Sequence, residues 1–258
     1  RRYRSLKRLF SRPLSAIAHV SARTPEDAAR FEEIGIPAER ITVEGDMKLD
    51  RPLPDEPPFA EDARRLARGR GVWVAGSVAD EELEPVIEAH RTLRRGLDAF
   101  LVLAPRRPES FDAAARRLEA AGLAHTRRSA LPAAGPADVL LLDSIGELAA
   151  TYRLGDVAFL GGTFAPLGGH NVVEPLRAGL PTVHGPSTAN IRATLEAAKE
   201  CVRLVATPDR LADEVGALLR DEAARTRARE AAALLFAESS GTTRRAAERA
   251  LAMARGTA

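Results

Sequence analysis

Residues 157–179 read VAFLGGTFAPLGGHNVVEPLRAG, and this stretch decides the predicted fold. Its first four residues form an apolar run typical of a buried strand. Its last four predict a short helix that is closed by a glycine. Glycines therefore crowd a strand-to-helix turn, where they allow backbone N–H groups to approach an anion and where the helix N-terminus adds partial positive charge. The stretch predicts a phosphate-binding turn.

Asn171 and Glu174 lie three residues apart at the start of this predicted helix. There they are placed to bind hydroxyl groups, such as those of a ribose. The same spacing is typical of a capping box, in which side chains only satisfy the unpaired N–H groups of the first helical turn. The two interpretations are compatible, because a capped helix start flanked by glycine is also a pre-formed anion site.

Strand patterns and helical patterns alternate on both sides of the turn. Strands are predicted at residues 72–75, 99–103, 125–127, 139–142, 157–160, 182–183 and 203–205. Helices are predicted at residues 80–95, 108–121, 145–153, 208–220, 221–237 and 241–254. Strands with helices between them indicate a parallel sheet covered on both faces, which is the Rossmann-like class of α/β fold.

A proline-rich segment at residues 51–58 carries four prolines in eight residues and predicts a stiff linker. The residues before it contain two further strand patterns, joined by a helix that begins near Thr24 and Pro25. We therefore expect part of a second domain at residues 1–50, a main domain at residues 59–240 and a C-terminal helix at residues 241–258.

Polar residues and glycines come directly after five of the predicted strands, at the edge of a parallel sheet where ligands bind. They are Ser77, Arg106, the group Asp143, Ser144, Gly146 and Glu147, the glycine-rich turn, and His184. Arg106 offers a planar fork of donors that suits a phosphate, and a structural salt bridge is its alternative role. Its convergence with the glycine-rich turn favours the ligand role. His170, inside the turn, either donates to a phosphate or substrate or simply packs.

The charge of the chain is balanced overall but uneven along it. A net charge of +2 over 258 residues argues against a dedicated nucleic-acid-binding protein. Residues 1–13 carry six basic residues and no acidic one, with apolar residues between them at roughly helical spacing. This pattern predicts a basic amphipathic segment able to contact an anionic membrane surface, and a solvated helix is the alternative.

Several other classes of site are excluded by the residues present. Cys201 is the only cysteine, so no disulfide and no cysteine-based zinc site forms within the chain, and a reducing cytoplasm is the simple inference. The five histidines lack metal-ligand spacing, and we expect no metal. Neither a Walker P-loop, a dinucleotide fingerprint nor a nucleophile elbow is present. No apolar run of about 18 residues predicts a membrane span. The first residue is not Met, which leads us to expect a start inside a longer protein.

Five motifs resemble those of the 3-deoxy-D-manno-octulosonic acid (Kdo) transferases of lipid A biosynthesis, and they follow one another along the chain in the same order as in that family. Residues 161–190 resemble the nucleotide-sugar-binding signature of that family. Residues 45–50 (GDMKLD) are similar to its G-N-L-K-F-D, and residues 104–111 (APRRPESF) to its P-R-H-P-E-R-F. Residues 143–148 (DSIGEL) are similar to D-T-M-G-E-L, and residues 185–190 (GPSTAN) to G-P-H-x-x-N. The resemblance covers nearly the whole chain.

The resemblance implies a GT-B glycosyltransferase architecture, in which two Rossmann-like domains face each other across a cleft. It implies CMP-Kdo as donor with no further cofactor, a lipid A precursor as acceptor, and a peripheral location at the cytoplasmic face of the inner membrane. Family contacts to CMP fall on Pro105, Arg106, Ile145, Gly146, Glu147, Asn171, Val172, Val173 and Glu174. Further contacts are expected at Ser77, Gly162, Gly168, Gly169 and His170.

The chain also departs from the family pattern. Arg107 stands where a histidine is usual, Ile145 replaces a methionine, and residues 77–79 (SVA) replace S-T-H near the donor sugar. The family's N-terminal acceptor domain, which holds the glutamate expected to act as base, is represented only by residues 1–50. The sequence thus predicts the donor-binding half of a Kdo transferase. A GT-B transferase that uses a UDP-sugar and a non-catalytic nucleotide-binding module are the alternatives.

Overall fold

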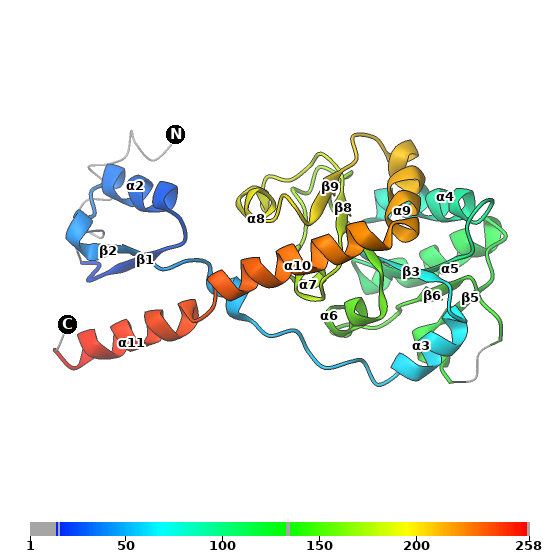
Figure 1. Ribbon diagram of the computed structural model, residues 1–258, viewed down its shortest axis with the longest axis horizontal. Helices are drawn as coiled ribbons and strands as arrows, with labels where there is room; N and C mark the ends of the chain where they lie inside the picture. The colour runs from blue at the N-terminus through cyan, green and yellow to red at the C-terminus, as the bar shows by residue number, and fades with distance from the viewer. Residues whose placement is uncertain (1–13, 15, 133–134, 257–258) are drawn as a thin grey trace. The chain divides into compact units, whose positions relative to one another are not determined.

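The computed structural model describes residues 14, 16–132 and 135–256, and the chain divides into two compact units (Figure 1). Unit 1 comprises Arg1–Arg51 and Phe236–Ala258, and unit 2 comprises Pro52–Leu235. The basic segment at residues 1–13 lies outside the described residues. None of the helices in the described part of the chain is long and apolar enough to cross a bilayer.

Unit 2 is built on a seven-stranded parallel sheet with the order β5-β6-β4-β3-β7-β8-β9. The strands are β3 (Gly71–Val78), β4 (Ala99–Pro105), β5 (His125–Arg127), β6 (Val139–Leu141), β7 (Val157–Leu160), β8 (Thr182–His184) and β9 (Val202–Leu204). All seven strands predicted for this unit are confirmed. The order runs outward from β3 on one side and from β7 on the other, so the topological switch lies between these two strands.

Helices cover both faces of this sheet, as the alternation of strands and helices predicts. They are α3 (Ala60–Ala67), α4 (Leu83–Leu93), α5 (Phe111–Ala120), α6 (Leu148–Thr151), α7 (Val173–Arg177), α8 (Arg192–Ala197), α9 (Leu211–Arg220) and α10 (Glu222–Glu238). Successive residues of one strand enter opposite cores: Trp73 packs in the core under α4, α5 and α9, and Val74 in the core under α3. Burial of both faces explains the continuous apolar runs of the strands.

One predicted helix begins later than its pattern indicates. The sequence predicts a helix over residues 145–153, whereas α6 begins at Leu148. Gly146 has a φ of +88°, a left-handed conformation that cannot be part of an α-helix. The residues before Leu148 therefore form a loop at the end of β6.

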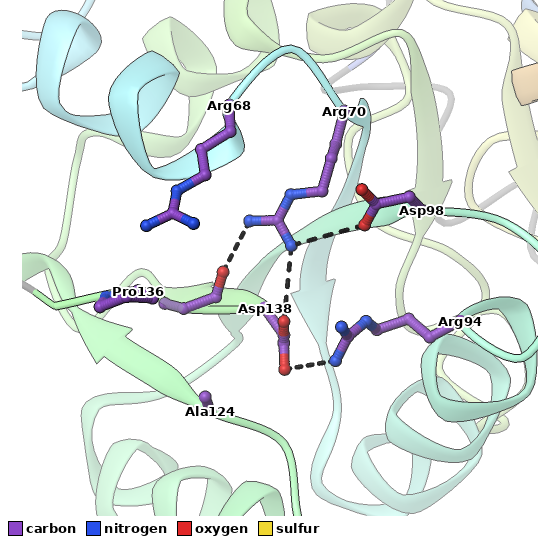
Figure 2. A pocket seen from close by; sticks show the side chains of 8 residues that line it. Arg68, Arg70, Arg94, Asp98, Ala124, Pro136 and Asp138 are labelled. Atoms are coloured by element: carbon purple, nitrogen blue, oxygen red, sulfur yellow. Dashed lines mark hydrogen bonds and ion pairs between the residues drawn. The ribbon is translucent and has the colours of Figure 1, made fainter.

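The starts of the central strands are tied together by Arg70 (Figure 2). Its guanidinium donates to the carbonyl oxygens of Leu66 and Ala137 at 2.7 and 2.6 Å, and lies 3.4 Å from the Asp138 carboxylate. Arg94 pairs with the same carboxylate. A cavity of about 280 Å³ opens beside these groups. It lies at the edge where the strands begin, and its arginine network is engaged in joining α3 to the sheet.

Unit 1 contains the parallel pair β1 (Val20–Ala22) and β2 (Ile41–Val43), connected by α2 (Pro25–Ile34). The predicted start of α2 is confirmed, since Thr24 Oγ1 accepts a hydrogen bond from the Asp27 N–H at 3.1 Å. The C-terminal helix α11 (Thr242–Ala254) packs in the same unit, where Arg249 Nε donates to Glu44 at 2.7 Å. A strand-helix-strand element of this kind fits part of a second Rossmann-like domain.

Candidate functional site

The loops that follow β3, β4, β6, β7 and β8 meet at one edge of the unit 2 sheet, here called the carboxyl edge. Backbone bonds join the loops where the topology switches: Gly161 N–H donates to Gly76 at 2.9 Å, and Arg106 N–H donates to Val78 at 2.8 Å. In open parallel sheets, ligands bind in the crevice at this switch point. The structure therefore brings the loops with the predicted site residues to one place.

Glu82, which the sequence analysis missed, fills the glycine-rich turn. Its side chain is buried, with 1% of the residue exposed. Oε1 accepts hydrogen bonds from the backbone N–H groups of Thr163, Phe164 and Ala165 at 2.9, 2.8 and 3.2 Å. Oε2 accepts from Gly162 at 2.6 Å and from Ala79 at 2.9 Å. The turn does bind an anion, and that anion is a carboxylate of the chain itself.

The N–H groups of residues 162–165, 168 and 169 therefore have partners inside the protein, and the prediction that the glycines of this turn bind a phosphate through them is wrong. Gly162 donates to Glu82, Gly168 to Ser187 Oγ at 2.9 Å, and Gly169 to the Gly162 carbonyl at 2.8 Å. Each of the three candidate glycines thus has its N–H group occupied inside the protein. Glycine is required here for close packing instead, because a Cβ on Gly161 would lie 2.2 Å from the carbonyl oxygen of Ser77.

His170 packs against the same turn. A Cβ on Gly162 would meet His170 Nε2 at 2.6 Å, and this nitrogen is buried without a hydrogen-bond partner among the described residues. Burial lowers the pKa of His170, and the charge of Arg106 lowers it further, while Glu82 raises it. The packing interpretation of His170 is the one that the geometry supports.

At the start of α7 the structure shows the capping interaction of Asn171, and the ribose role of Glu174 stays a prediction. Asn171 Oδ1 accepts from the Val173 N–H at 3.1 Å, so Asn171 caps the helix. Its amide also donates to Glu174 Oε1 at 2.9 Å, in an exposed position, which leaves the Glu174 carboxylate at the surface beside the cap. Val172 and Val173 are buried and offer a ligand only their backbone groups.

Arg106 has the arrangement expected of a ligand-binding arginine. Pro105 ends β4 and is buried, whereas Arg106 is exposed. The structure shows no ion pair of Arg106 with an acidic residue of the described chain, so the alternative role as a structural salt bridge is not supported. Ser77 has a φ of +54°, and the chain bulges between Ala75 and Val78. Ser77 lies close to Arg106, since Val78 is paired with Pro105 in the sheet. Strained backbone of this kind persists only when neighbouring residues hold it.

Side chains and backbone groups that follow β5 form ion pairs and hydrogen bonds with the loop after β6. Glu147 forms a two-pronged ion pair with Arg128, whose Nε and Nη2 lie 3.1 and 2.9 Å from the carboxylate. Asp143 accepts from the N–H and the hydroxyl of Ser129 at 2.9 and 2.6 Å. Ile145 projects outward, with 68% of its surface exposed. No cluster of three or more His, Cys, Asp or Glu residues able to hold a metal occurs in the described part of the chain.

The fold and this edge define the class of protein. Unit 2 is a Rossmann-like domain of the kind found in GT-B glycosyltransferases. The C-terminal CMP-Kdo binding domain of WaaA from Acinetobacter baumannii matches this chain with a TM-score of 0.63 and 27% sequence identity. That match covers 69% of this chain and 97% of the WaaA domain.

The sequence comparisons show that this chain is similar to Kdo transferases. Residues 1–51 match the family model described as 3-deoxy-D-manno-octulosonic-acid transferase (kdotransferase). The chain is 39% identical to the 3-deoxy-D-manno-octulosonic acid transferase of Bordetella pertussis over 240 residues, and 31% identical to that of Haemophilus influenzae over 252 residues. These matches cover 90% and 95% of this chain but 56% and 59% of the relatives. The predicted resemblance is confirmed, and the chain spans little more than half the length of these relatives.

Proposed function

We propose that this chain is the CMP-Kdo-binding part of a Kdo transferase that acts on a lipid A precursor. The observation that carries the proposal is the match of unit 2 to nearly the whole CMP-Kdo binding domain of WaaA. The exposed side chains at the carboxyl edge support the proposal, because they include the cationic and hydrogen-bonding groups that a charged nucleotide requires. The site needs no cofactor besides the donor.

Arg106 is the residue we assign to the charged part of the donor, phosphate or sugar carboxylate, since its planar fork matches an oxyanion. Glu174 is assigned to the ribose hydroxyls, with Asn171 orienting its carboxylate at 2.9 Å. Pro105, Ile145, Gly146 and Glu147 line the same edge. Because the N–H groups of residues 162–165, 168 and 169 are occupied, we assign the anion to Arg106 rather than to the glycines of the turn.

The reaction proposed for the whole enzyme is a direct displacement with inversion at the anomeric carbon. A carboxylate in the N-terminal part of the whole enzyme, outside this chain, takes the proton of the acceptor hydroxyl, and the CMP phosphate leaves as Arg106 stabilises its charge. The acceptor would be reached at the cytoplasmic face of the inner membrane, with the basic residues 1–13 against the anionic lipid surface. The 258-residue chain by itself should bind CMP and transfer no sugar.

Titration calorimetry tests the proposal directly. CMP should bind the purified chain at least about tenfold more tightly than UMP, which separates a CMP-Kdo site from a UDP-sugar site. Radiolabelled CMP-Kdo and a lipid A precursor, incubated with the chain, should give no labelled lipid. Tighter binding of UMP would overturn the donor assignment, and labelled lipid would overturn the assignment of the base to a part of the enzyme outside this chain.

A further inference from the structure

The strongest polar contact at the loop after β6 comes from a residue that no motif singled out. Arg128 begins the short turn η6 (Arg128–Ala130), directly after the edge strand β5. Its guanidinium meets both oxygens of Glu147, and it lies over the Phe59 ring at 4.5 Å. Each partner of the pair keeps 23% of its side chain exposed. A two-pronged pair of this kind fixes orientation as well as charge.

The neighbouring residues add to the same clamp. Ser129 holds the Asp143 carboxylate through its N–H and hydroxyl, and Ser144 Oγ donates to Glu147. Thr151 Oγ1 donates to the Glu147 carbonyl at 2.8 Å. The loop at residues 143–147 contains a glycine with positive φ and an exposed isoleucine, and contributes no strand or helix. Its conformation therefore depends on these contacts.

We propose that Arg128 is a positioning residue for the donor, acting through Glu147. It neutralises the Glu147 carboxylate and holds residues 143–147 in one conformation, so that an anionic nucleotide can approach the carboxyl edge. This inference rests on the proposed function, because it assumes that the edge binds CMP.

The charge argument follows from the sheet order. Arg106 follows β4 and Glu147 lies in the loop after β6, and these strands are neighbours. Neighbouring strands lie about 4.8 Å apart, well inside the screening length of about 8 Å at physiological salt. Without Arg128, the Glu147 carboxylate would repel the phosphate and compete with it for Arg106. Arg128 prevents both effects.

The test compares a charged and an uncharged ligand of the same shape. We would titrate CMP and cytidine against the chain and against the variants Arg128→Ala, Arg128→Met and Arg128→Lys. The methionine variant keeps an aliphatic contact over Phe59 and serves if the alanine variant loses its fold. We expect Arg128→Met to weaken CMP about tenfold and cytidine less than about threefold. Arg128→Lys should recover only part of the CMP affinity, because lysine keeps the positive charge but not the bidentate geometry of the pair with Glu147.

Two further variants separate this role from general stabilisation. In the Glu147→Gln background, where no charge remains to be neutralised, Arg128→Met should weaken CMP binding by less than about threefold, against about tenfold in the parent chain. Arg116→Ala is the control, since it removes an exposed positive charge on α5 and leaves the contacts of residues 143–147 intact; CMP affinity should change less than about threefold.

The outcomes keep the inference and the proposed function apart. If the parent chain binds neither ligand, the proposed function fails and the inference with it. If the parent binds CMP but Arg128→Met binds it equally well, the inference alone fails. Equal losses of CMP and cytidine on Arg128→Met, of the same size in the parent chain and in the Glu147→Gln background, would assign Arg128 a purely structural role and overturn the inference.

Discussion

Glu82 Oε2 lies 2.6 Å from the backbone nitrogen of Gly162, a residue 80 positions later in the chain. This bond and its four companions place a buried carboxylate where the glycine content predicts a phosphate. Hydrogen bonds to a charged group contribute about 1.5–3 kcal/mol each, so the turn is held in its conformation before any ligand arrives. The proposed nucleotide site therefore excludes the N–H groups of residues 162–165.

Replacing Glu82 with glutamine should destabilise unit 2 by about 2–4 kcal/mol. The amide would turn its NH₂ group toward the N–H groups of Gly162 and Ala79, which would leave buried donors without acceptors. Urea denaturation measures the loss. Glu81→Gln, at the exposed neighbouring position, is the control and should change stability by less than about 0.5 kcal/mol. Equal stabilities of the two variants would show that the carboxylate is not needed.

Arg106→Ala should weaken CMP binding by about tenfold or more, and Arg106→Lys should recover little of the loss. The charge survives in the lysine variant, but the planar fork does not. Calorimetry with CMP measures both. Arg107→Ala is the matched control, since Arg107 is also exposed and adjacent. If Arg107→Ala binds CMP more weakly than Arg106→Ala does, the assignment within this loop is wrong.

Glu174→Gln should weaken CMP binding by about ten- to a hundredfold while the fold persists, because a charged hydrogen bond to the ribose is lost. The contact with Asn171 survives in this variant, since the glutamine carbonyl still accepts. Asn171→Ala, by contrast, removes the cap and should lower stability by about 1 kcal/mol. Calorimetry and thermal denaturation are read together. An unchanged CMP affinity in Glu174→Gln would restrict the pair to capping.

His90 should make the stability of unit 2 depend on pH. Burial lowers the pKa of His90 from 6.5 to about 3; its hydrogen bond to the Asp138 carbonyl opposes this, and Arg94 and Arg70 add to it. Below pH 6.5 the imidazole of His90 is therefore protonated in the unfolded chain but remains neutral in the folded chain. The contribution of His90 to the free energy of unfolding is full above pH 6.5, and it falls by up to about 1.4 kcal/mol per pH unit as the pH drops toward 3.

Urea denaturation at pH 7, 6 and 5 tests this dependence. The parent chain should lose stability more steeply than His90→Gln, and the difference between the two slopes isolates His90 from the other histidines. At pH 7, the variant should be the less stable of the two, because the Trp73 indole donates to His90 Nδ1 at 3.1 Å in the buried core. Parallel slopes would contradict the prediction.

The hydrophobic periodicity and the positions of Gly and Pro were sufficient to predict the seven strands of unit 2, whereas α3 was not predicted and α6 begins later than expected. A strand such as β7 is buried on both faces, and that burial requires a continuous apolar run, which is visible in the sequence. The same is true of Thr24 and Pro25, whose chemistry marks a helix start locally. The edge of the sheet that carries the site also followed, because parallel strands bring their ends together. The family motifs located the same loops.

The tertiary structure alone decided which groups in those loops are free. Nothing local distinguishes Glu82 from Glu81, yet one is buried in the glycine-rich turn and the other is exposed. Likewise Arg128 pairs with Glu147, 19 residues later in the chain and beyond strand β6, and Arg106 remains exposed. Hydrogen bonds between residues distant in the chain leave no periodic signal, because they depend on the order in which strands pair. The sequence determined where the site lies, and the packing of the sheet determined which residues are left to bind a ligand.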